Sequence, residues 1–455
     1  MTHVHFMGIG GTGVSGLALM AIHKGYEVSG CDLKTSPYLK MVEENGVPCF
    51  TEHSAEHLES VDIVVHSTAV SPDNPELKSA REKEIDVFSR GEFLWELVKD
   101  DETVGISGSH GKTTTTWMLY HIFRRTGNKA SIYAGGKSSH ISAQCSEGPW
   151  IIELDESDGS VFKAFPDILL INNLEMEHPD FYADEHDLKI KFKNYINKWI
   201  EDDRRLIIGS EYSTGSELVD FYDSKTFPSS REIMSRASFS TKEGVEFIYQ
   251  GNELFMITDY GEFFVGNIIQ PPYMLQNKCA AVLAFHEYFV RKEGRVPSIP
   301  SDIWTDLPGI ERRFHKEGIY RGVSLISDYA HHPSELKVIL DRALNENMNF
   351  GIVFQPHRIS RFRTFFEDFE EVLRNMDPVI ILPTFSAGEK IDLDPASKLA
   401  ERLQNFCENV MFMPSVDYAV DYFRKNISSF KINTLIFAGA GDIDKIYRRL
   451  LKDEI

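Results

Sequence analysis

A loop at residues 108–113, Gly-Ser-His-Gly-Lys-Thr, carries the residue types that bind phosphate groups. Backbone amides of such a loop can surround phosphates, the Lys112 ammonium can offset their charge, and the Thr113 hydroxyl can bind Mg²⁺. The apolar run before the loop predicts a strand, and the run after it predicts a helix. The usual phosphate-loop pattern has glycine where this chain has Ile106, so the match is incomplete. The strand-to-helix setting nevertheless predicts a nucleoside triphosphate site.

A second glycine loop lies near the N-terminus, where Gly8, Gly10 and Gly13 fit the spacing G-x-G-x-x-G. These glycines allow a tight turn, and the following helix offers free N–H groups to a diphosphate. Asp32 comes about 20 residues later, at the end of the next predicted strand, where a carboxylate can accept hydrogen bonds from a ribose. The pattern predicts a bound nucleotide diphosphate and leaves NAD, FAD and a sugar nucleotide open.

Acidic residues are concentrated at 153–158, Glu-Leu-Asp-Glu-Ser-Asp, directly after a predicted strand. An acidic cluster is usually a solvated loop, but in a domain with a phosphate loop this position is where a Mg²⁺-binding carboxylate is needed. His178 follows the next predicted strand. A single histidine is more often structural than metal-binding, so the residues alone predict no metal there.

Two motifs follow predicted strands in the last third of the chain, Asp-Tyr-Ala-His-His-Pro at 328–333 and Gln-Pro-His-Arg at 355–358. Arg361 and Arg363 lie just beyond the second motif. Open α/β sheets bind ligands at the carboxyl ends of their strands. In a chain this acidic, arginines at such a position indicate recognition of an anion.

The elements that position these motifs alternate along the whole chain, with short β-rich runs followed by helical stretches. This rhythm predicts an α/β protein with parallel, doubly wound sheets. The predicted strands include residues 4–7, 27–30, 61–65, 103–107, 150–154, 167–171, 323–327, 349–354, 378–382 and 434–438, and the predicted helices include 14–24, 91–99 and 114–126. Breaks near residues 90 and 296 divide the chain into three consecutive domains, at 1–89, 90–295 and 296–455.

The composition limits the possible partners. At 42% apolar and 26% charged, the 455 residues have the composition of globular domains. A net charge of −21 repels phosphate backbones and anionic lipids, which argues against nucleic-acid and membrane partners. No apolar run approaches the roughly 18 residues of a membrane span, and the N-terminus opens into a strand, so we expect a cytoplasmic protein without a signal peptide. The five cysteines are far apart and include no CxxC pair, a spacing that excludes a disulfide framework or a cysteine zinc site.

Taken together, these stretches resemble the Mur ligases of bacterial cell-wall synthesis. The resemblance covers the whole chain, and its motifs occur in the family's order: GIGGTGVSGLA at 8–18, STAV at 67–70, GSHGKTTTT at 108–116, ELDESDGS at 153–160, NLEMEH at 173–178, RRF at 312–314, DYAHHPSE at 328–335, QPHRISRFR at 355–363, AGEK at 387–390 and AGAGDI at 438–443. Within the family, the motifs are most similar to those of the branch that joins L-alanine to UDP-N-acetylmuramate.

The resemblance implies a Rossmann-like N-terminal domain for the UDP-sugar, a central P-loop domain for ATP, and a Rossmann-like C-terminal domain that helps to hold the nucleotide and L-alanine. The residues expected at the UDP-sugar are Gly8, Gly10, Gly11, Gly13, Asp32, Ser67, Thr68 and Ala69. Those expected at ATP are Gly108, Ser109, His110, Gly111, Lys112, Thr113, Thr114, Asn277, Arg313 and Asp328. The expected Mg²⁺ ligands are Thr113, Glu156 and His178, which reverses the structural interpretation of His178. The expected catalytic residues are Lys112, His331, Arg358 and Arg361.

The reaction implied by the resemblance is the ATP-dependent synthesis of an amide in peptidoglycan precursor synthesis. The carboxylate of UDP-N-acetylmuramate attacks the γ-phosphate and becomes an acyl phosphate, which the amine of L-alanine then attacks. His331 is a candidate for the base that deprotonates this amine. We expect closure of the domains during the reaction, and a monomer or weak homodimer.

Three alternatives compete with this interpretation. A murein-peptide ligase joins a recycled tripeptide to the same UDP-sugar, but typically has tyrosine at the position of Ser157 and lacks the QPHR segment. An NAD-dependent dehydrogenase would explain the loop at 8–13 and leave the loop at 108–113 without a role. A nucleotide-binding scaffold without catalysis would require Lys112, Thr113 and Glu156 all to be idle.

Overall fold

The computed structural model describes residues 1–453 apart from 68, 139–140, 180, 201–202, 210, 212, 223, 236–238, 241–243, 268–269, 308–311, 388 and 390–393, and gives the backbone alone for 136–138, 141, 213 and 234. Thr68, one of the residues expected at the UDP-sugar, lies outside the described residues. The chain forms two compact units, one of Met1–Met176 and Phe181–Pro308 and the other of Glu177–Asp180 and Gly309–Ile455. Among the described residues, the first unit carries one parallel, one mostly parallel and one small antiparallel sheet, and the second carries one mostly parallel sheet.

The N-terminal sheet is parallel throughout and has five strands in the order β3-β2-β1-β4-β5. Its strands are β1 His3–Met7, β2 Glu27–Cys31, β3 Cys49–Phe50, β4 Ile63–His66 and β5 Asp86–Ser89. The connecting helices are α1 Thr12–His23, α2 Pro37–Glu44, η1 Ala55–Leu58, α3 Pro75–Glu82 and α4 Arg90–Val98. The order reverses between β1 and β4, which places the loop after β1 at a switch point, where such sheets bind ligands.

The central sheet has seven strands in the order β12-β11-β10-β6-β9-β7-β8, and only its edge pair β7–β8 is antiparallel. Its strands are β6 Thr103–Ser107, β7 Ser131–Ser138, β8 Ile141–Gln144, β9 Trp150–Glu153, β10 Ile168–Ile171, β11 Arg205–Gly209 and β12 Lys225–Phe227. Its helices are α5 Lys112–Arg125, η2 Ser160–Lys163, α6 Glu185–Trp199, α7 Ser213–Phe221, α8 Ser230–Ser235 and α9 Pro272–Glu293. Both β9 and β10 pair with β6, so the loops after these three strands lie together.

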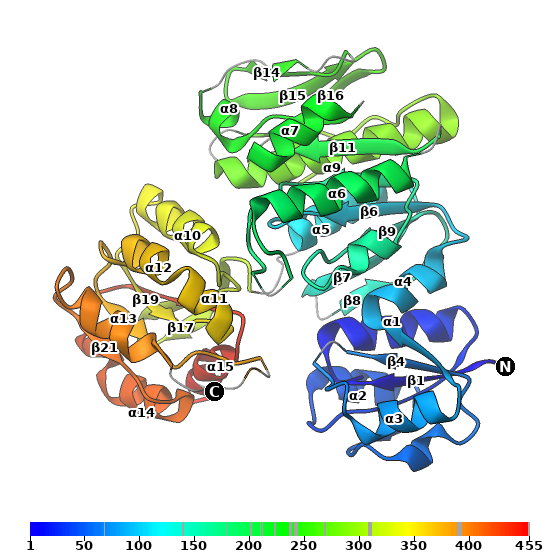
Figure 1. Ribbon diagram of the computed structural model, residues 1–455. Helices are drawn as coiled ribbons and strands as arrows, with labels where there is room; N and C mark the ends of the chain where they lie inside the picture. Colours follow the sequence, from blue (N-terminus) through cyan, green and yellow to red (C-terminus); the bar gives the residue numbers. More distant parts are fainter. Residues whose placement is uncertain are drawn as a thin grey trace. The chain divides into compact units, whose positions relative to one another are not determined.

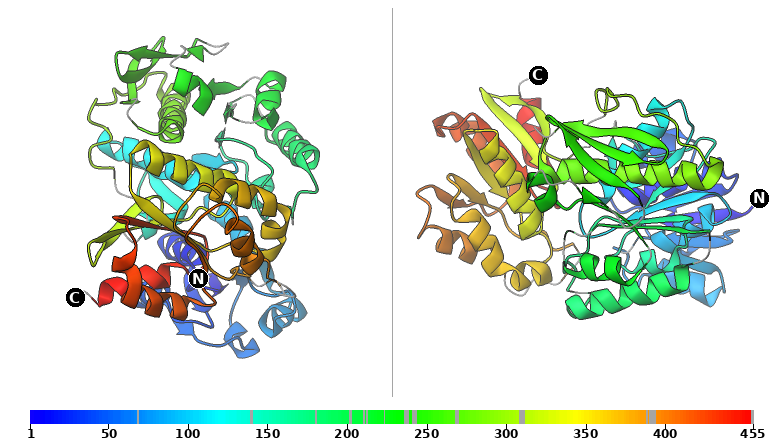
Figure 2. Two further views of the ribbon diagram at one scale, coloured as in Figure 1. Left: turned by 90° about the vertical axis from the view of Figure 1, so that its left-hand side faces the viewer. Right: turned by 90° about the horizontal axis from the view of Figure 1, so that it is seen from above.

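A small antiparallel sheet, which the sequence analysis did not predict, lies between β12 and α9 in the chain. Its strands are β13 Phe239–Ser240, β14 Glu246–Gln250, β15 Glu253–Thr258 and β16 Gly261–Asn267. It contacts α9, and the green strands and the yellow-green helix lie side by side in Figures 1 and 2. Residues before the second unit also pack here, since the Trp304 indole donates to the Val265 carbonyl at 2.6 Å.

The second unit contains a six-stranded sheet in the order β17-β18-β22-β19-β20-β21, antiparallel only between β17 and β18. Its strands are β17 His315–Tyr320, β18 Val323–Asp328, β19 Phe350–Phe354, β20 Val379–Ile381, β21 Val410–Phe412 and β22 Thr434–Ala438. Its helices are α10 Pro333–Asn345, α11 Ile359–Thr364, α12 Phe366–Leu373, α13 Ala396–Leu403, α14 Val416–Asn426, η3 Ile427–Ser429 and α15 Asp444–Lys452. Two separate apolar clusters cover the two faces of the sheet. Because both faces are buried, the strands carry apolar residues on both sides.

These sheets confirm the predicted fold class of consecutive parallel α/β domains. The domain boundaries drawn at residues 90 and 296 stay a prediction, since the division into compact units falls at 308–309. Among the described helices, none is both long enough and apolar enough to span a lipid bilayer.

Candidate active site

The loop between β6 and α5 has a backbone that requires glycine at two positions. Gly108 has φ +123° and Gly111 has φ +79°, in the left-handed region. A Cβ atom on Gly111 would lie 2.5 Å from the Asn277 Oδ1 atom, and one on Gly108 would lie 2.8 Å from the Asn173 carbonyl oxygen. Gly111 is the N-cap of α5, so Lys112 is the first helical residue. Asn277, from α9, therefore packs against the loop.

Lys112 brings the loop together with the acidic cluster. Its Nζ atom donates to the Gly108 carbonyl at 2.7 Å and forms an ion pair with Glu156 Oε2 at 2.8 Å. Glu156 is only 1% exposed, and its ion pair with Lys112 offsets the cost of burying the carboxylate. The predicted phosphate-binding lysine and the predicted metal-binding carboxylate are thus neighbours.

Thr113 lies beside a second carboxylate, Glu153, at the end of β9. The Thr113 hydroxyl donates to Glu153 Oε1 at 3.1 Å, and the Gly135 N–H donates to Glu153 Oε2 at 2.7 Å. Burial raises the pKa of Glu153, and the nearby Lys112 ammonium counteracts this effect. Mg²⁺ prefers hard oxygen ligands, so the Thr113 hydroxyl and the Glu156 carboxylate fit this ion.

Polar residues after β10 hold the loop in shape. Asn173 Oδ1 accepts from the His110 N–H at 2.8 Å, and the Ser109 hydroxyl donates to the Glu175 carbonyl at 2.9 Å. The Asn172 amide donates to the His110 carbonyl at 3.2 Å. The sequence analysis quoted NLEMEH at 173–178 but gave a role only to its histidine, and it did not single out Asn172. Its position after the strand next to β6 was the feature that could have identified this role.

The N-terminal glycine loop is built around Asp32. The Gly10 N–H donates to Asp32 Oδ2 at 3.0 Å, and the Gly8 N–H donates to the Cys31 carbonyl at 2.8 Å. Gly8 has φ +81°, and a Cβ atom added there would lie 3.0 Å from the Ser67 Cβ atom. The predicted residues Gly8, Gly10, Asp32 and Ser67 therefore come together at the switch point of this sheet.

Two more of the predicted residues complete the loop or lie next to it. The Gly11 N–H donates to the Gly8 carbonyl at 3.0 Å, which closes the tight turn. The Ala69 N–H donates to the Ser67 hydroxyl at 3.2 Å.

Arg90, which the sequence analysis did not single out, joins the N-terminal domain to the acidic cluster. Its guanidinium donates to Asp155 Oδ2 at 3.0 Å and lies 3.9 Å from Asp158 Oδ2. Burial alone would raise the pKa of Asp155, but the Arg90 charge outweighs this effect and the pKa is lowered. The Tyr133 hydroxyl donates to the Gly13 carbonyl at 3.1 Å in the same region.

In the second unit, three predicted residues gather around Glu177. The Arg361 guanidinium, 3% exposed, donates to His178 Nδ1 at 3.0 Å and lies 3.7 Å from Glu177 Oε1. His331 Nε2 lies 3.6 Å from the same carboxylate oxygen. Since Arg361 occupies Nδ1 of His178, the other ring nitrogen of His178 is the one suited to a metal.

The ring of His331 is oriented by its own strand end. Its Nδ1 atom lies 2.9 Å from the Tyr329 carbonyl oxygen, which can only accept. The neutral ring therefore carries its hydrogen at Nδ1 and its lone pair at Nε2. Asp328 accepts from the Phe314 and Ala330 N–H groups at 2.6 and 2.8 Å. Burial raises the pKa of Asp328 to about 6, against the opposing effect of Arg313.

Arg358 and His357 follow β19. Arg358 has φ +62° and is the N-cap of α11, a conformation that only surrounding contacts can maintain in a residue with a side chain. The His357 ring stacks on Phe385 with centroids 5.6 Å apart. Burial, together with the nearby His331 and Arg361, lowers the pKa of His357 to about 2.

The structure divides the predicted site residues between the two units. Lys112, Thr113, Glu156 and Asn277 are neighbours in the first unit, whereas His178 belongs to the second. The second unit also contains the predicted residues Arg313, Asp328, His331, Arg358 and Arg361.

Comparisons with known proteins place this arrangement in a family. A model of the Mur ligase family catalytic domain matches residues 3–102, and a model of the Mur ligase middle domain matches residues 106–284. The UDP-N-acetylmuramate–L-alanine ligases of Sulfurihydrogenibium sp. and Aquifex aeolicus are each 32% identical to the chain, over 99% of its length and 97% of theirs.

Solved structures share the fold over the whole chain. The UDP-N-acetylmuramate–alanine ligase of Thermotoga maritima has a TM-score of 0.76 at 23% identity and covers 100% of this chain and 99% of its own. A murein peptide ligase of Psychrobacter arcticus has a TM-score of 0.71 at 19% identity, over 99% and 98%. Because two family models match most of the chain and relatives above 30% identity align along nearly all of it, the chain belongs to the Mur ligase family.

Proposed function

We propose that the chain is an ATP-dependent ligase that joins L-alanine to the carboxylate of UDP-N-acetylmuramate, releasing ADP and phosphate. The observation that carries the proposal is the phosphate loop whose Lys112 contacts Glu156 and whose Thr113 contacts Glu153. This loop lies in a chain that aligns from end to end with UDP-N-acetylmuramate–L-alanine ligases.

ATP would bind with its phosphates on the amides of residues 108–114, at the N-terminus of α5. Lys112 would move from Glu156 to the γ-phosphate and offset the negative charge that gathers when a carboxylate approaches a phosphate. Thr113 and Glu156 would hold one Mg²⁺, and His178 would contribute to a second. Bound Mg²⁺ polarises the phosphoryl oxygens and neutralises their charge.

UDP-N-acetylmuramate would bind at the N-terminal glycine loop, which offers amides at the start of α1 to its diphosphate. Asp32 would hold the loop through the Gly10 N–H, while the adjacent Ser67 and Ala69 would border the site. Thr68 is expected to take part as well.

The amine of L-alanine must lose a proton when it attacks the acyl phosphate. His331 is suited to accept this proton, since the Tyr329 carbonyl places its lone pair at Nε2. Arg358 and Arg361 would stabilise the negative charge of the phosphate and of the tetrahedral intermediate.

The test is phosphate release from ATP with Mg²⁺ and UDP-N-acetylmuramate, measured with and without each amino acid or peptide. Release that requires both the UDP-sugar and L-alanine supports the proposal. Release with the tripeptide L-alanyl-γ-D-glutamyl-meso-diaminopimelate but not with L-alanine would assign the chain to the murein-peptide ligases. Oxidation of NADH in place of phosphate release would refute a ligase.

The cellular setting is part of the same proposal. A ligase of this kind would act in the cytoplasm, as a monomer or weak homodimer, in peptidoglycan synthesis. It would thereby support cell shape and cell division.

A further inference from the structure

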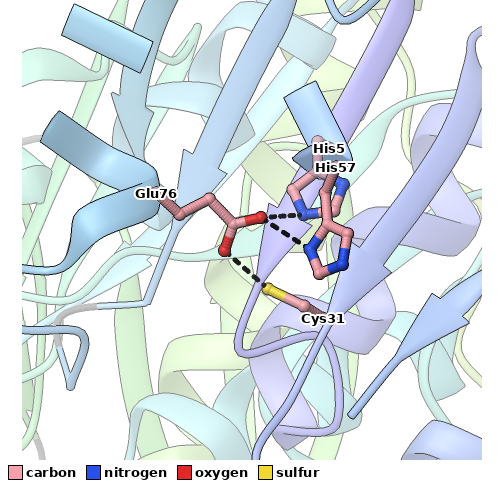
Figure 3. Close-up of side chains that lie close together, drawn as sticks. All are labelled: His5, Cys31, His57 and Glu76. Atoms are coloured by element: carbon pink, nitrogen blue, oxygen red, sulfur yellow. Dashed lines mark hydrogen bonds and ion pairs between the residues drawn. The ribbon is translucent and has the colours of Figure 1, made fainter. Parts of the chain in front are cut away.

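Four side chains of the N-terminal domain converge on one buried point (Figure 3). They are His5 of β1, Cys31 of β2, His57 of η1 and Glu76 of α3. One ligand atom of each lies within 4.8 Å of all the others. His5, Cys31 and Glu76 are fully buried, and His57 is nearly so.

The distances in this cluster are close to those of a tetrahedral metal site. Glu76 Oε1 lies 3.1 Å from His5 Nε2 and 3.0 Å from His57 Nδ1, and Glu76 Oε2 lies 3.2 Å from Cys31 Sγ. Bonds of about 2.0–2.3 Å from Zn²⁺ place tetrahedral ligands about 3.3–3.7 Å apart. These three distances would therefore change by only a few tenths of an ångström when the ion binds, and the ligand atoms of the other pairs already lie within 4.8 Å of one another.

The His5 ring is held as metal-binding histidines are. Its Nδ1 atom lies 2.8 Å from the Ser29 hydroxyl, which fixes the plane of the ring. Its Nε2 atom is buried and directed into the cluster, where it lies 3.1 Å from Glu76 Oε1. A hydrogen bond at one ring nitrogen, with the other nitrogen directed at the remaining ligands, is the arrangement of a metal-binding histidine.

The charges of the cluster also balance around a divalent cation. A Cys31 thiolate and the Glu76 carboxylate together neutralise Zn²⁺, so the buried site as a whole would carry no net charge. A cysteine binds Zn²⁺ as its thiolate, so Zn²⁺ binding would release the thiol proton to solvent.

We propose that His5, Cys31, His57 and Glu76 form a structural Zn²⁺ site within the N-terminal domain. Sulfur and nitrogen ligands favour Zn²⁺ over Mg²⁺, and four protein ligands leave no open position for substrate. His53 borders the site, because its Nδ1 atom lies 3.0 Å from Glu76 Oε2 and 3.2 Å from Cys31 Sγ. The site is independent of the proposed ligase activity.

A route for the ion leads past His57. This residue lines a surface cavity of about 820 Å³ together with Ser29 and Phe50. The His57 ring stacks on Phe50 with centroids 4.0 Å apart. This stacking orients the His57 ring at the edge of the site, next to the cavity. The sequence does not indicate the site, because its four ligands come from four separate elements and include a single cysteine.

The test is Zn²⁺ binding to the full chain after treatment with a chelator, measured by competition with a chromophoric chelator in excess Mg²⁺. We expect one tightly bound Zn²⁺ per chain. Substitution of Co²⁺ should give the intense visible bands of a tetrahedral site and a thiolate charge-transfer band. The Cys31→Ser variant should lose that band and bind Zn²⁺ at least roughly 100-fold more weakly, and Ser29→Ala should weaken binding about 10- to 100-fold.

Two further variants keep the test decisive if Cys31→Ser fails to fold. His57→Gln alters the ligand at the edge of the site, where the side chain is 8% exposed, and should also lose tight binding while its circular dichroism spectrum stays unchanged. His23→Gln, at an exposed position of α1, should bind as the parent chain does. The proposal is overturned if the parent chain binds no Zn²⁺ in excess Mg²⁺, or if folded His57→Gln binds it as tightly as the parent.

Discussion

Replacing Lys112 by methionine separates its role in catalysis from its role in stability. The Lys112 side chain is 15% exposed and the Glu156 side chain only 2%, so the substitution removes the cation next to a buried carboxylate. Breaking a buried ion pair lowers the free energy of unfolding by about 3–5 kcal/mol. Because Lys112 is partly exposed, we expect a loss of about 3 kcal/mol. Loss of this charge at the transferred phosphate should also reduce turnover by at least roughly 100- to 1000-fold.

The double variant Lys112→Met/Glu156→Gln distinguishes the two effects, because it removes both charges together. It should recover about 2 kcal/mol of the lost free energy of unfolding, while phosphate release stays abolished. Lys129→Met is the matched control, since its ion pair with Glu147 is exposed and should contribute almost nothing.

Urea denaturation followed by tryptophan fluorescence measures the stability of the first unit, because all five tryptophans lie within residues 95–304. Phosphate release measures turnover, and isothermal titration with UDP-N-acetylmuramate should show unchanged binding. The reasoning is refuted if Lys112→Met is as stable as the parent chain, or if the double variant is no more stable than the single one.

Three further predictions follow from particular contacts. Gly111→Ala should abolish ATP binding in a folded chain, because its Cβ atom would lie 2.5 Å from Asn277 Oδ1 at φ +79°; unchanged ATP affinity by titration would contradict this. Arg361→Ala should lower kcat by at least roughly 100-fold, whereas the exposed Arg363→Ala should retain activity; equal effects in a phosphate-release assay would exclude a specific role for Arg361. Burial lowers the pKa of Lys278 to about 8, so the folded chain binds fewer protons than the unfolded chain between about pH 8 and 10, and stability due to this group rises with pH there. Lys278→Met should therefore raise the free energy of unfolding, measured by urea denaturation at pH 7, by more than about 1 kcal/mol and lose that advantage near pH 10. An advantage independent of pH would refute the assignment.

Much of the fold follows from the short apolar runs that precede each motif. The predicted strand at 103–107 is β6, residue for residue, because both of its faces are buried and it reads as one apolar run. Helix α5 begins two residues earlier than predicted, at Lys112, since Gly111 in the left-handed conformation caps it. The antiparallel strands at 239–267 were missed, because they are partly exposed and their apolar runs, such as those at 247–249 and 254–257, are bounded by polar residues.

Contacts in the site that follow from the order of the strands could be predicted. Contacts between loop residues that are far apart in the sequence could not. Lys112 and Glu156 follow β6 and β9, which are adjacent in the sheet, so their contact follows from the topology. The pair Arg90–Asp155 spans 65 residues, and Arg361–His178 spans 183. No local pattern encodes such partners, since each depends on how loops from separate elements are packed.

The measurement that tests the proposed reaction most directly uses UDP-N-acetylmuramate with ¹⁸O in both oxygens of its carboxylate, incubated with ATP, Mg²⁺ and L-alanine. If the carboxylate attacks the γ-phosphate and L-alanine then displaces phosphate, mass spectrometry should find one ¹⁸O in the released phosphate and one in the new amide. Amide formation with unlabelled phosphate would contradict an acyl phosphate, and the absence of any amide would contradict the proposed function.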